Sequence, residues 1–497
     1  MLYTSTRDKN VKVTSAEAIA QGISKDGGLF VPTEIPAISK EFVDSLVPLS
    51  YIERAKKVLA LYLTDYTEEE IDMCVSGAYA EGKFSSEKVS PIKRTSDGKN
   101  ILELWRGPTC AFKDMALQLL PYLLTVAAKK TVADKTIVIL VATSGDTGKA
   151  ALEGFRDVPG TKIMVFYPND GVSPMQKLQM TTQAGENVCV CAINGNFDDA
   201  QNGVKKIFTD KAVAEKLSEN GMMFSSANSI NWGRLVPQIV YYISAYCDLI
   251  ENGTIKNGEP MNVVVPTGNF GNILAAYYAM KMGVPVNKLI CASNANNVLT
   301  DFLKTGVYDR NRSFYTTTSP SMDILISSNL ERLLFHLADE NDATIREWMG
   351  KLSSEGKYEI SEDVKSQVVA LFDAGCCDDE ATAETISEYY KKGYLCDTHT
   401  AVAVKVYDEY VASTGDKTES VIASTANPYK FSAAVLKAVK GEVPADADEF
   451  EQVDLLKEAS GEPCPEQLGS LKGKEPRFTD CCNKEDMINM VYNMLGI

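Results

Sequence analysis

Histidine is almost absent from this chain of 497 residues, which contains only His336 and His399. Two histidines cannot supply a histidine-rich metal site, and a Ser-His-Asp triad or a Cys-His dyad would have to use one of them. His336 lies in an apolar helical pattern and is expected to be a satisfied helix-face residue. His399, in a polar turn before a helix, is the better functional candidate, although a helix cap is the usual role of such a position. We therefore expect no metal site.

Other absences narrow the class of protein. The twelve cysteines include no Cys-x-x-Cys pair, and most are expected to be buried thiols. The net charge is −17 and no basic block occurs, so nucleic acid and membrane surfaces are poor partners. The longest apolar run, residues 115–128, is too short to span a bilayer. The first ten residues lack the apolar core of a signal peptide, so we expect a cytoplasmic protein.

Short apolar strands alternate with helical patterns from about residue 95 onward. The pattern predicts strands over 101–105, 136–142, 162–167, 188–193, 262–266, 288–293 and 420–424. Such alternation is typical of an α/β fold with parallel sheets covered on both faces and ligand sites at the carboxyl ends of strands. Before it, residues 1–92 form a mixed amino-terminal domain with helical patterns over 42–63 and 68–81. We expect a helical insert over 321–390 and irregular structure over 442–480.

Lys113 is the candidate reactive group. It follows the Gly107-Pro108 break between a strand and an apolar helix, with Phe112 before it and Met115 soon after. Burial and the positive end of the following helix would both disfavour the ammonium, lower the pKa, and leave an amine able to form a Schiff base. A loop lysine alone is ordinarily a solvated residue, so the other motifs have to decide.

The segment from Thr143 to Lys149 follows a strand and opens a helix. Its small residues expose backbone N–H groups to an anion, and Ser144 and Thr147 add hydroxyl donors. It is not a Walker A loop, because Gly145 stands only three residues before Gly148 and no Ser or Thr follows Lys149. A carboxylate or phosphate anchor remains.

Residues 268–272, Gly-Asn-Phe-Gly-Asn, form a second glycine turn between a strand and a helix. The third glycine of a dinucleotide loop is missing, and no acidic residue lies between Glu259 and Asp301 to bind a ribose. Two glycines and two asparagines suit a single phosphate, while a simple packing turn stays open as the alternative.

Two further groups complete the pattern. Thr425 is a hydroxyl at the carboxyl end of a predicted strand. Arg234 lies beside amide side chains just before a helix, where it could bind phosphate or carboxylate or form a structural ion pair. A lysine nucleophile together with a one-phosphate cofactor points to pyridoxal phosphate.

These motifs together resemble the threonine synthases, in their longer form, within the fold-type II pyridoxal-phosphate enzymes. The matching segments are Gly22–Pro32, Gly107–Asp114, Thr143–Gly148, Asn228–Arg234, Gly268–Asn272 and Ser424–Pro428. The resemblance implies two doubly wound, mainly parallel sheet domains besides the amino-terminal mixed domain. The large cofactor domain would comprise 93–130 and 245–497, and the small substrate-binding domain 131–244.

The resemblance also implies roles for individual residues. Lys113 would hold the cofactor as a Schiff base, and Thr425 would bond the pyridine nitrogen. The cofactor phosphate would be held by Gly268, Asn269, Phe270 and Asn272. The substrate carboxylate would be held by Ser144, Gly145, Asp146 and Thr147. Arg234 and Asn231 would receive the substrate phosphate.

The implied reaction converts O-phospho-L-homoserine and water to L-threonine and phosphate, by γ-elimination and then β-addition of water. Lys113 would move the protons. A serine or threonine dehydratase-like lyase is the nearest alternative, and it would need no site for a substrate phosphate. A binding protein that has lost catalysis is the alternative from another class. We expect a monomer or a small homo-oligomer.

Overall fold

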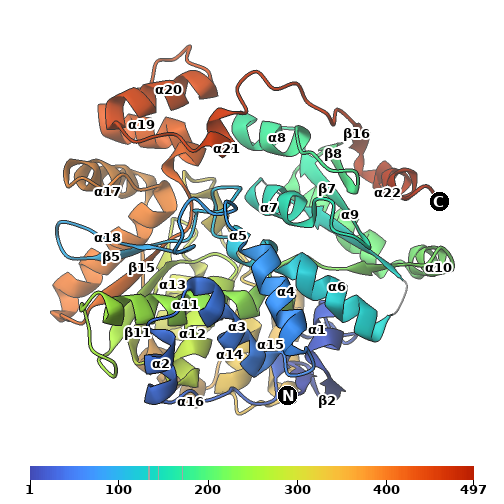
Figure 1. Cartoon of the computed structure of the whole chain (residues 1–497), viewed down its shortest axis with the longest axis horizontal. Helices are drawn as coiled ribbons and strands as arrows, with labels where there is room; N and C mark the ends of the chain where they lie inside the picture. Colours follow the sequence, from blue (N-terminus) through green and yellow to red (C-terminus); the bar gives the residue numbers. More distant parts are fainter. Residues whose placement is uncertain (133–134, 144, 171) are drawn as a thin grey trace.

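The computed structural model describes residues 1–132, 135–143, 145–170 and 172–497, without the side chain of Asp198. Two largely parallel sheets form the two main bodies of the molecule, and the amino-terminal region packs beside them (Figure 1). This arrangement agrees with the α/β fold predicted from the sequence.

The amino-terminal region combines an antiparallel sheet of order β2-β1-β3 with four helices. Its elements are β1 (Tyr3–Ser5), β2 (Asp8–Val13), α1 (Ser15–Gln21), β3 (Phe30–Pro32), α2 (Lys40–Leu46), α3 (Tyr51–Tyr62) and α4 (Glu68–Ala78). The helix predicted over 42–63 is interrupted, because Pro48 cannot continue the hydrogen-bond ladder and Ser50 starts α3 with a capping box.

The larger parallel sheet has the strand order β14-β11-β10-β15-β5-β4, with β4 antiparallel at its edge. Its strands are β4 (Ile92–Arg94), β5 (Asn100–Glu103), β10 (Met261–Pro266), β11 (Val286–Ser293), β14 (Phe372–Cys376) and β15 (Ser420–Ser424). Val263 and Val265 face one core, which includes α11 (Trp232–Glu251), α12 (Gly271–Met282) and α13 (Val298–Thr305). Val264 faces a second core formed with α18 (Thr398–Thr414) and α19 (Ser432–Lys440). Both faces are covered, so the strands read as continuous apolar runs.

The smaller sheet has the order β16-β8-β7-β6-β9, and its strand pairs are parallel. Its strands are β6 (Thr136–Ala142), β7 (Thr161–Pro168), β8 (Val188–Asn194), β9 (Met222–Ser225) and β16 (Cys481–Asn483). The helices around it are α6 (Leu120–Thr131), α7 (Asp146–Phe155), α8 (Pro174–Thr181), α9 (Phe197–Thr209), α10 (Lys211–Glu219) and α22 (Met487–Leu495). Ile139 packs in the core that contains α7, whereas Val138 and Leu140 pack in the core that contains α9 and α22.

The carboxyl-terminal chain differs from the prediction that 245–497 belongs to the large domain. After α19 it forms α20 (Glu449–Ser460) and α21 (Glu466–Gly469), then crosses to the smaller sheet and adds β16 at its edge (Figure 1). The prediction of irregular structure over 442–480 is therefore wrong for α20, which Asp448 starts with a capping box. The predicted boundary at 244 falls inside α11.

The region predicted as a helical insert over 321–390 also contains strands. Its elements are α14 (Leu330–Leu337), α15 (Asp342–Ser354), β13 (Lys357–Glu359), α16 (Glu362–Leu371), β14 and α17 (Asp379–Lys391). β13 pairs with β12 (Val307–Asp309), and β14 is an edge strand of the larger sheet. Short 3₁₀ turns are η1 (Pro320–Met322), η2 (Pro428–Phe431) and η3 (Lys484–Asp486). No helix in the described part of the chain is long and apolar enough to cross a membrane.

Candidate active site

Lys113 lies between the two parallel sheets, directly before the short helix α5 (Asp114–Leu117). Its side chain is 14% exposed, and its Nζ is 3.4 Å from Ser321 Oγ and 4.0 Å from Asp146 Oδ2. Burial lowers the pKa of Lys113 to about 8, against the opposing effect of the Asp146 carboxylate. The structure thus supports the sequence prediction of a lysine with a lowered pKa.

The loop that carries Lys113 is held by its neighbours. The Asp114 carboxylate accepts bonds from the Thr109 N–H (2.8 Å) and hydroxyl (2.6 Å), and burial raises the pKa of this carboxyl to about 6. Gly107 has to be glycine, because a Cβ there would lie 2.6 Å from the Asp114 side chain. The Phe112 N–H donates to the carbonyl of Thr425 (2.8 Å), so the lysine loop is tied to the end of β15.

Residues 268–272 form the turn between β10 and α12. The Gly268 carbonyl accepts from Ser327 Oγ (2.8 Å), and the Asn269 carbonyl accepts from the N–H and Nδ2 of Asn329 (3.1 Å each). Phe270 caps α12 in the left-handed region, at φ 62°. These carbonyls are bonded to residues 327–329, and the first N–H groups of α12 have no intrahelical acceptor, so they can bind an anion. That they hold a cofactor phosphate stays a prediction.

Asn272 provides an unused donor at the same place. Its Oδ1 accepts a bond from the Tyr242 hydroxyl, while its buried Nδ2 has no partner among the described residues. A buried amide N–H without a partner costs free energy, which a bound phosphate oxygen would recover. The unpartnered Nδ2 of Asn272 therefore fits a cofactor that carries a phosphate.

Gly268→Ala is expected to weaken cofactor binding. A Cβ at position 268 would lie 2.5 Å from the Ser321 carbonyl oxygen, so the turn would have to move. Overpacking of this kind costs about 1–3 kcal/mol, equivalent to a ~5- to 150-fold increase in Kd for pyridoxal phosphate. Gly350→Ala is the matched control, because no atom lies within 4 Å of the Cβ position there. Fluorescence titration with pyridoxal phosphate measures both, and an unchanged Kd for Gly268→Ala would contradict the assignment.

The predicted anion loop at the start of α7 is partly described. Ser144 lies outside the described residues. Gly145 has φ 141°, and a Cβ there would collide with the Gln176 side chain, so only glycine fits. The first N–H groups of α7, at Asp146 and Thr147, face no intrahelical acceptor and can bind an anion.

The Asp146 side chain has a different role from its backbone. Its Oδ1 lies 2.6 Å from Lys430 Nζ and accepts from Gln176 Nε2 (3.2 Å). Burial alone would raise the pKa of Asp146, yet the ammonium groups of Lys430 and Lys113 hold it well below its usual range. An ionised carboxylate repels a substrate carboxylate, so only the Asp146 N–H can contribute to the predicted carboxylate site.

Arg234, in the first turn of α11, is a buried cation. Its Nη1 donates to the carbonyl of Ala227, its Nε has no partner, and no carboxylate among the described residues forms an ion pair with it. Burial lowers its pKa to about 10. The structural ion pair left open by the sequence is thus absent from the described part of the chain, and the binding of an external anion by Arg234 stays a prediction.

Asn231 differs from its predicted role. Its Nδ2 donates to the carbonyls of Ile19 (3.0 Å) and Ser226 (2.8 Å), and its Oδ1 accepts from the Gly233 N–H (2.9 Å). The side chain caps α11 and has no N–H left for a substrate phosphate. We therefore leave Asn231 out of the proposed site.

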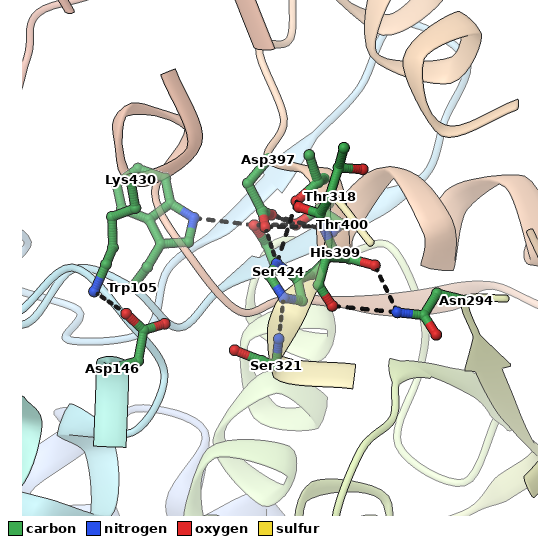
Figure 2. A network of polar contacts seen from close by, with 12 residues as sticks. Trp105, Asp146, Asn294, Thr318, Ser321, Asp397, His399, Thr400, Ser424 and Lys430 are labelled. Atoms are coloured by element: carbon green, nitrogen blue, oxygen red, sulfur yellow. Dashed lines mark hydrogen bonds and ion pairs between the residues drawn. The ribbon is translucent and has the colours of Figure 1, made fainter. Parts of the chain in front are cut away.

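A buried polar network behind Thr425 was not predicted. Ser424 Oγ accepts from Trp105 Nε1 (3.0 Å) and lies 2.9 Å from Thr400 Oγ1, whose hydroxyl donates to the Asp397 carboxylate (Figure 2). These contacts join the ends of β5 and β15 to the start of α18. Thr425 is itself buried, at the carboxyl end of β15.

His399 belongs to this network. Its Nδ1 lies 2.8 Å from Asp397 Oδ2, and its Nε2 accepts from the Ser321 N–H (3.1 Å) (Figure 2). Asp397, and not His399, caps α18, so the predicted helix-cap role is wrong for this histidine. His336 is a helix residue, as expected, and its side chain is 7% exposed and bonded to the Tyr278 hydroxyl (2.8 Å). No group of three His, Cys, Asp or Glu side chains in the described residues could hold a metal ion.

The parallel-sheet fold, the largely buried Lys113 and the glycine turn at residues 268–272 together point to the pyridoxal-phosphate enzymes. The family model described as "Pyridoxal-phosphate dependent enzyme" matches residues 102–425. The models "Threonine synthase N terminus" and "Threonine synthase, C-terminal" match residues 2–79 and 400–491. The chain belongs to the threonine synthase family of pyridoxal-phosphate-dependent enzymes, and the predicted fold-type II architecture is confirmed.

Individual relatives agree with this family. "Threonine synthase-like 1" of Homo sapiens is 43% identical over 86% of this chain, which spans only 58% of that protein. The threonine synthase of Pseudomonas aeruginosa is 39% identical over 90% of this chain and 92% of its own length. The crystal structure of pyridoxal-phosphate-bound threonine synthase from Brucella melitensis superimposes with a TM-score of 0.88, at 37% identity over 100% of this chain and 99% of that one.

Proposed function

We propose that this chain catalyses the pyridoxal-phosphate-dependent conversion of O-phospho-L-homoserine and water to L-threonine and phosphate. The observation that carries the proposal is Arg234, a buried guanidinium without an ion-pair partner among the described residues. Burying an unpaired charge is costly, so its anion is expected to arrive with the substrate. Serine and threonine, the substrates of the dehydratase-like alternative, carry no phosphate.

The chain has a residue for each part of pyridoxal phosphate that has to be held. Lys113 would attach it as a Schiff base, and Gly268, Asn269, Phe270 and Asn272 would hold its phosphate at the start of α12. Thr425 would bond its ring nitrogen through a neutral hydroxyl. When bound, the cofactor supplies an electron sink that stabilises negative charge at the substrate carbons.

The remaining chemistry falls to side chains of this chain. The amine of Lys113, with a pKa of about 8, can remove the proton from Cα and return protons as the double bond moves. Arg234 would bind the phosphate and stabilise it as it leaves Cγ. The N–H groups of Gly145, Asp146 and Thr147 would orient the substrate carboxylate, and Ser144 would belong to the same site.

A turnover assay tests this function directly. Purified protein with pyridoxal phosphate is expected to release inorganic phosphate and form threonine in equal amounts from O-phospho-L-homoserine. With L-serine or L-threonine alone, keto-acid formation should be slower by about 10²-fold or more, because Arg234 then has no anion to bind. Rapid keto-acid formation without use of the phosphorylated substrate would support the dehydratase-like alternative instead.

Three expectations stay predictions. They are the cytoplasmic location, the monomeric or small homo-oligomeric state, and the division into domains 1–92, 93–130 with 245–497, and 131–244. The crossing of β16 to the smaller sheet makes 481–497 part of the small domain in the division that we now propose.

A further inference from the structure

A second lysine is buried beside the first. The side chain of Lys430, in η2, has no exposed surface, and its Nζ lies 2.6 Å from Asp146 Oδ1 (Figure 2). The same amine donates to the Thr109 carbonyl (3.0 Å), in the loop that ends at Lys113. A lysine is almost never buried this deeply unless it is paired, so the contact with Asp146 explains how Lys430 is accommodated.

Asp146 lies between two amines at unequal distances. Its Oδ1 is 2.6 Å from Lys430, and its Oδ2 is 4.0 Å from Lys113. The short contact is a charge-assisted hydrogen bond, whereas the long one is at the limit of an ion pair. Gln176 donates a further bond to Oδ1, on the same side as Lys430. The carboxylate is therefore held mainly by Lys430.

The charges around Lys113 oppose one another. The carboxylates of Asp146 and Asp114 favour its ammonium form, whereas Lys430 and Arg234 disfavour it. Without Lys430, Lys113 would be the cation nearest to the Asp146 carboxylate. A direct ion pair between Asp146 and Lys113 would then keep the Lys113 amine protonated.

We propose that Lys430 is a positioning residue that binds the Asp146 carboxylate and so keeps the Lys113 amine free to act as a nucleophile and base. The role rests on the proposed function, in which Lys113 is the reactive amine.

The test is a titration of Lys113 in the full-length protein freed of cofactor. Labelling by 1-fluoro-2,4-dinitrobenzene, followed at Lys113 by peptide mass spectrometry across a pH series, reports the fraction of free amine. Lys430→Met is expected to raise the midpoint by about one pH unit, a tenfold loss of free amine at a fixed lower pH. Asp146→Asn is expected to lower the midpoint, and the double variant should fall between the two single variants.

Opposite shifts are what distinguish this role from a structural one, since general loosening of the site would move both midpoints in the same direction. Lys430→Arg, which keeps the charge, should stay near the wild-type midpoint. An unchanged midpoint in Lys430→Met overturns the proposal. If Lys430→Met does not fold, judged by circular dichroism, Lys430→Gln takes its place. If neither folds, the absence of a downward shift in Asp146→Asn is decisive against the proposal.

This experiment is independent of turnover. Because it uses neither pyridoxal phosphate nor O-phospho-L-homoserine, the opposite shifts can be observed in a protein that releases no phosphate, which would refute only the proposed function. A protein that turns over normally without the shifts would refute only the role of Lys430.

Discussion

Lys113→Ala is expected to abolish both cofactor attachment and turnover. The amine lies 4.0 Å from Asp146, at the start of α7, and 3.4 Å from Ser321 Oγ, and burial lowers its pKa to about 8. Removal should eliminate the Schiff-base absorbance near ~420 nm in the purified protein. Loss of the proton-transfer group alone should reduce phosphate release by about 10²–10⁴-fold.

The matched control is Lys83→Ala. Lys83 is also a lysine whose pKa is lowered by burial, but its amine donates to the Gly77 carbonyl (2.8 Å) in the amino-terminal region. Its removal should leave the absorbance band and the rate unchanged. If Lys113→Ala retains the band, the cofactor is attached elsewhere and the assignment of Lys113 is wrong.

The parts of the site that could be predicted are those that a short segment encodes by itself. The loop closed by Gly107 and Asp114 depends on residues close in the sequence, so its pattern identifies it. The glycines at 268 and 271 identify a turn between a strand and a helix, although the contacts of that turn with Ser321 and Ser327 could not be predicted. Seven strands could be predicted because burial on two faces leaves continuous apolar runs: β5, β6, β7, β8, β10, β11 and β15. The strands β4, β9, β14 and β16 were not predicted.

The contacts that could not be predicted join segments that are distant in the sequence. Lys430 reads as a charged residue after a strand, and only the folded chain shows that it meets Asp146. Likewise, Asn231 carries the same donors whether it binds phosphate or caps α11, and its partners at Ile19 and Ser226 decide between these roles. β16 is three residues long, too short for any periodicity to reveal.

Arg234→Met is expected to separate function from stability. If Arg234 binds the substrate phosphate, kcat/KM for O-phospho-L-homoserine should fall by about 10²–10³-fold. The fold should not suffer, because the variant removes a buried cation that lacks an ion-pair partner in the described residues. Replacing it by an apolar side chain of similar volume removes the desolvation penalty of an unpaired buried charge, so the free energy of unfolding should stay the same or increase.

Arg54→Met provides the contrast. Arg54 is buried like Arg234, but its guanidinium forms an ion pair with Asp248 (2.6 Å) and donates to the Leu46 (2.9 Å) and Val47 (2.7 Å) carbonyls. Removing it leaves a buried carboxylate without its partner, which should cost about 3–5 kcal/mol in the free energy of unfolding. Urea denaturation of both variants, with and without the substrate, measures the difference.

Comparison of the Arg234→Met and Arg54→Met variants shows whether the buried charge of Arg234 serves binding or stability. A stable but inactive Arg234→Met variant would mean that the guanidinium serves phosphate binding and lowers the free energy of unfolding of the protein without substrate. With the cofactor site saturated by pyridoxal phosphate, wild-type protein should then gain stability from added inorganic phosphate, through binding to the folded state, and Arg234→Met should not. If instead Arg234→Met unfolds as readily as Arg54→Met while its rate with O-phospho-L-homoserine is unchanged, the residue is structural, and the specificity for a phosphorylated substrate must come from another group.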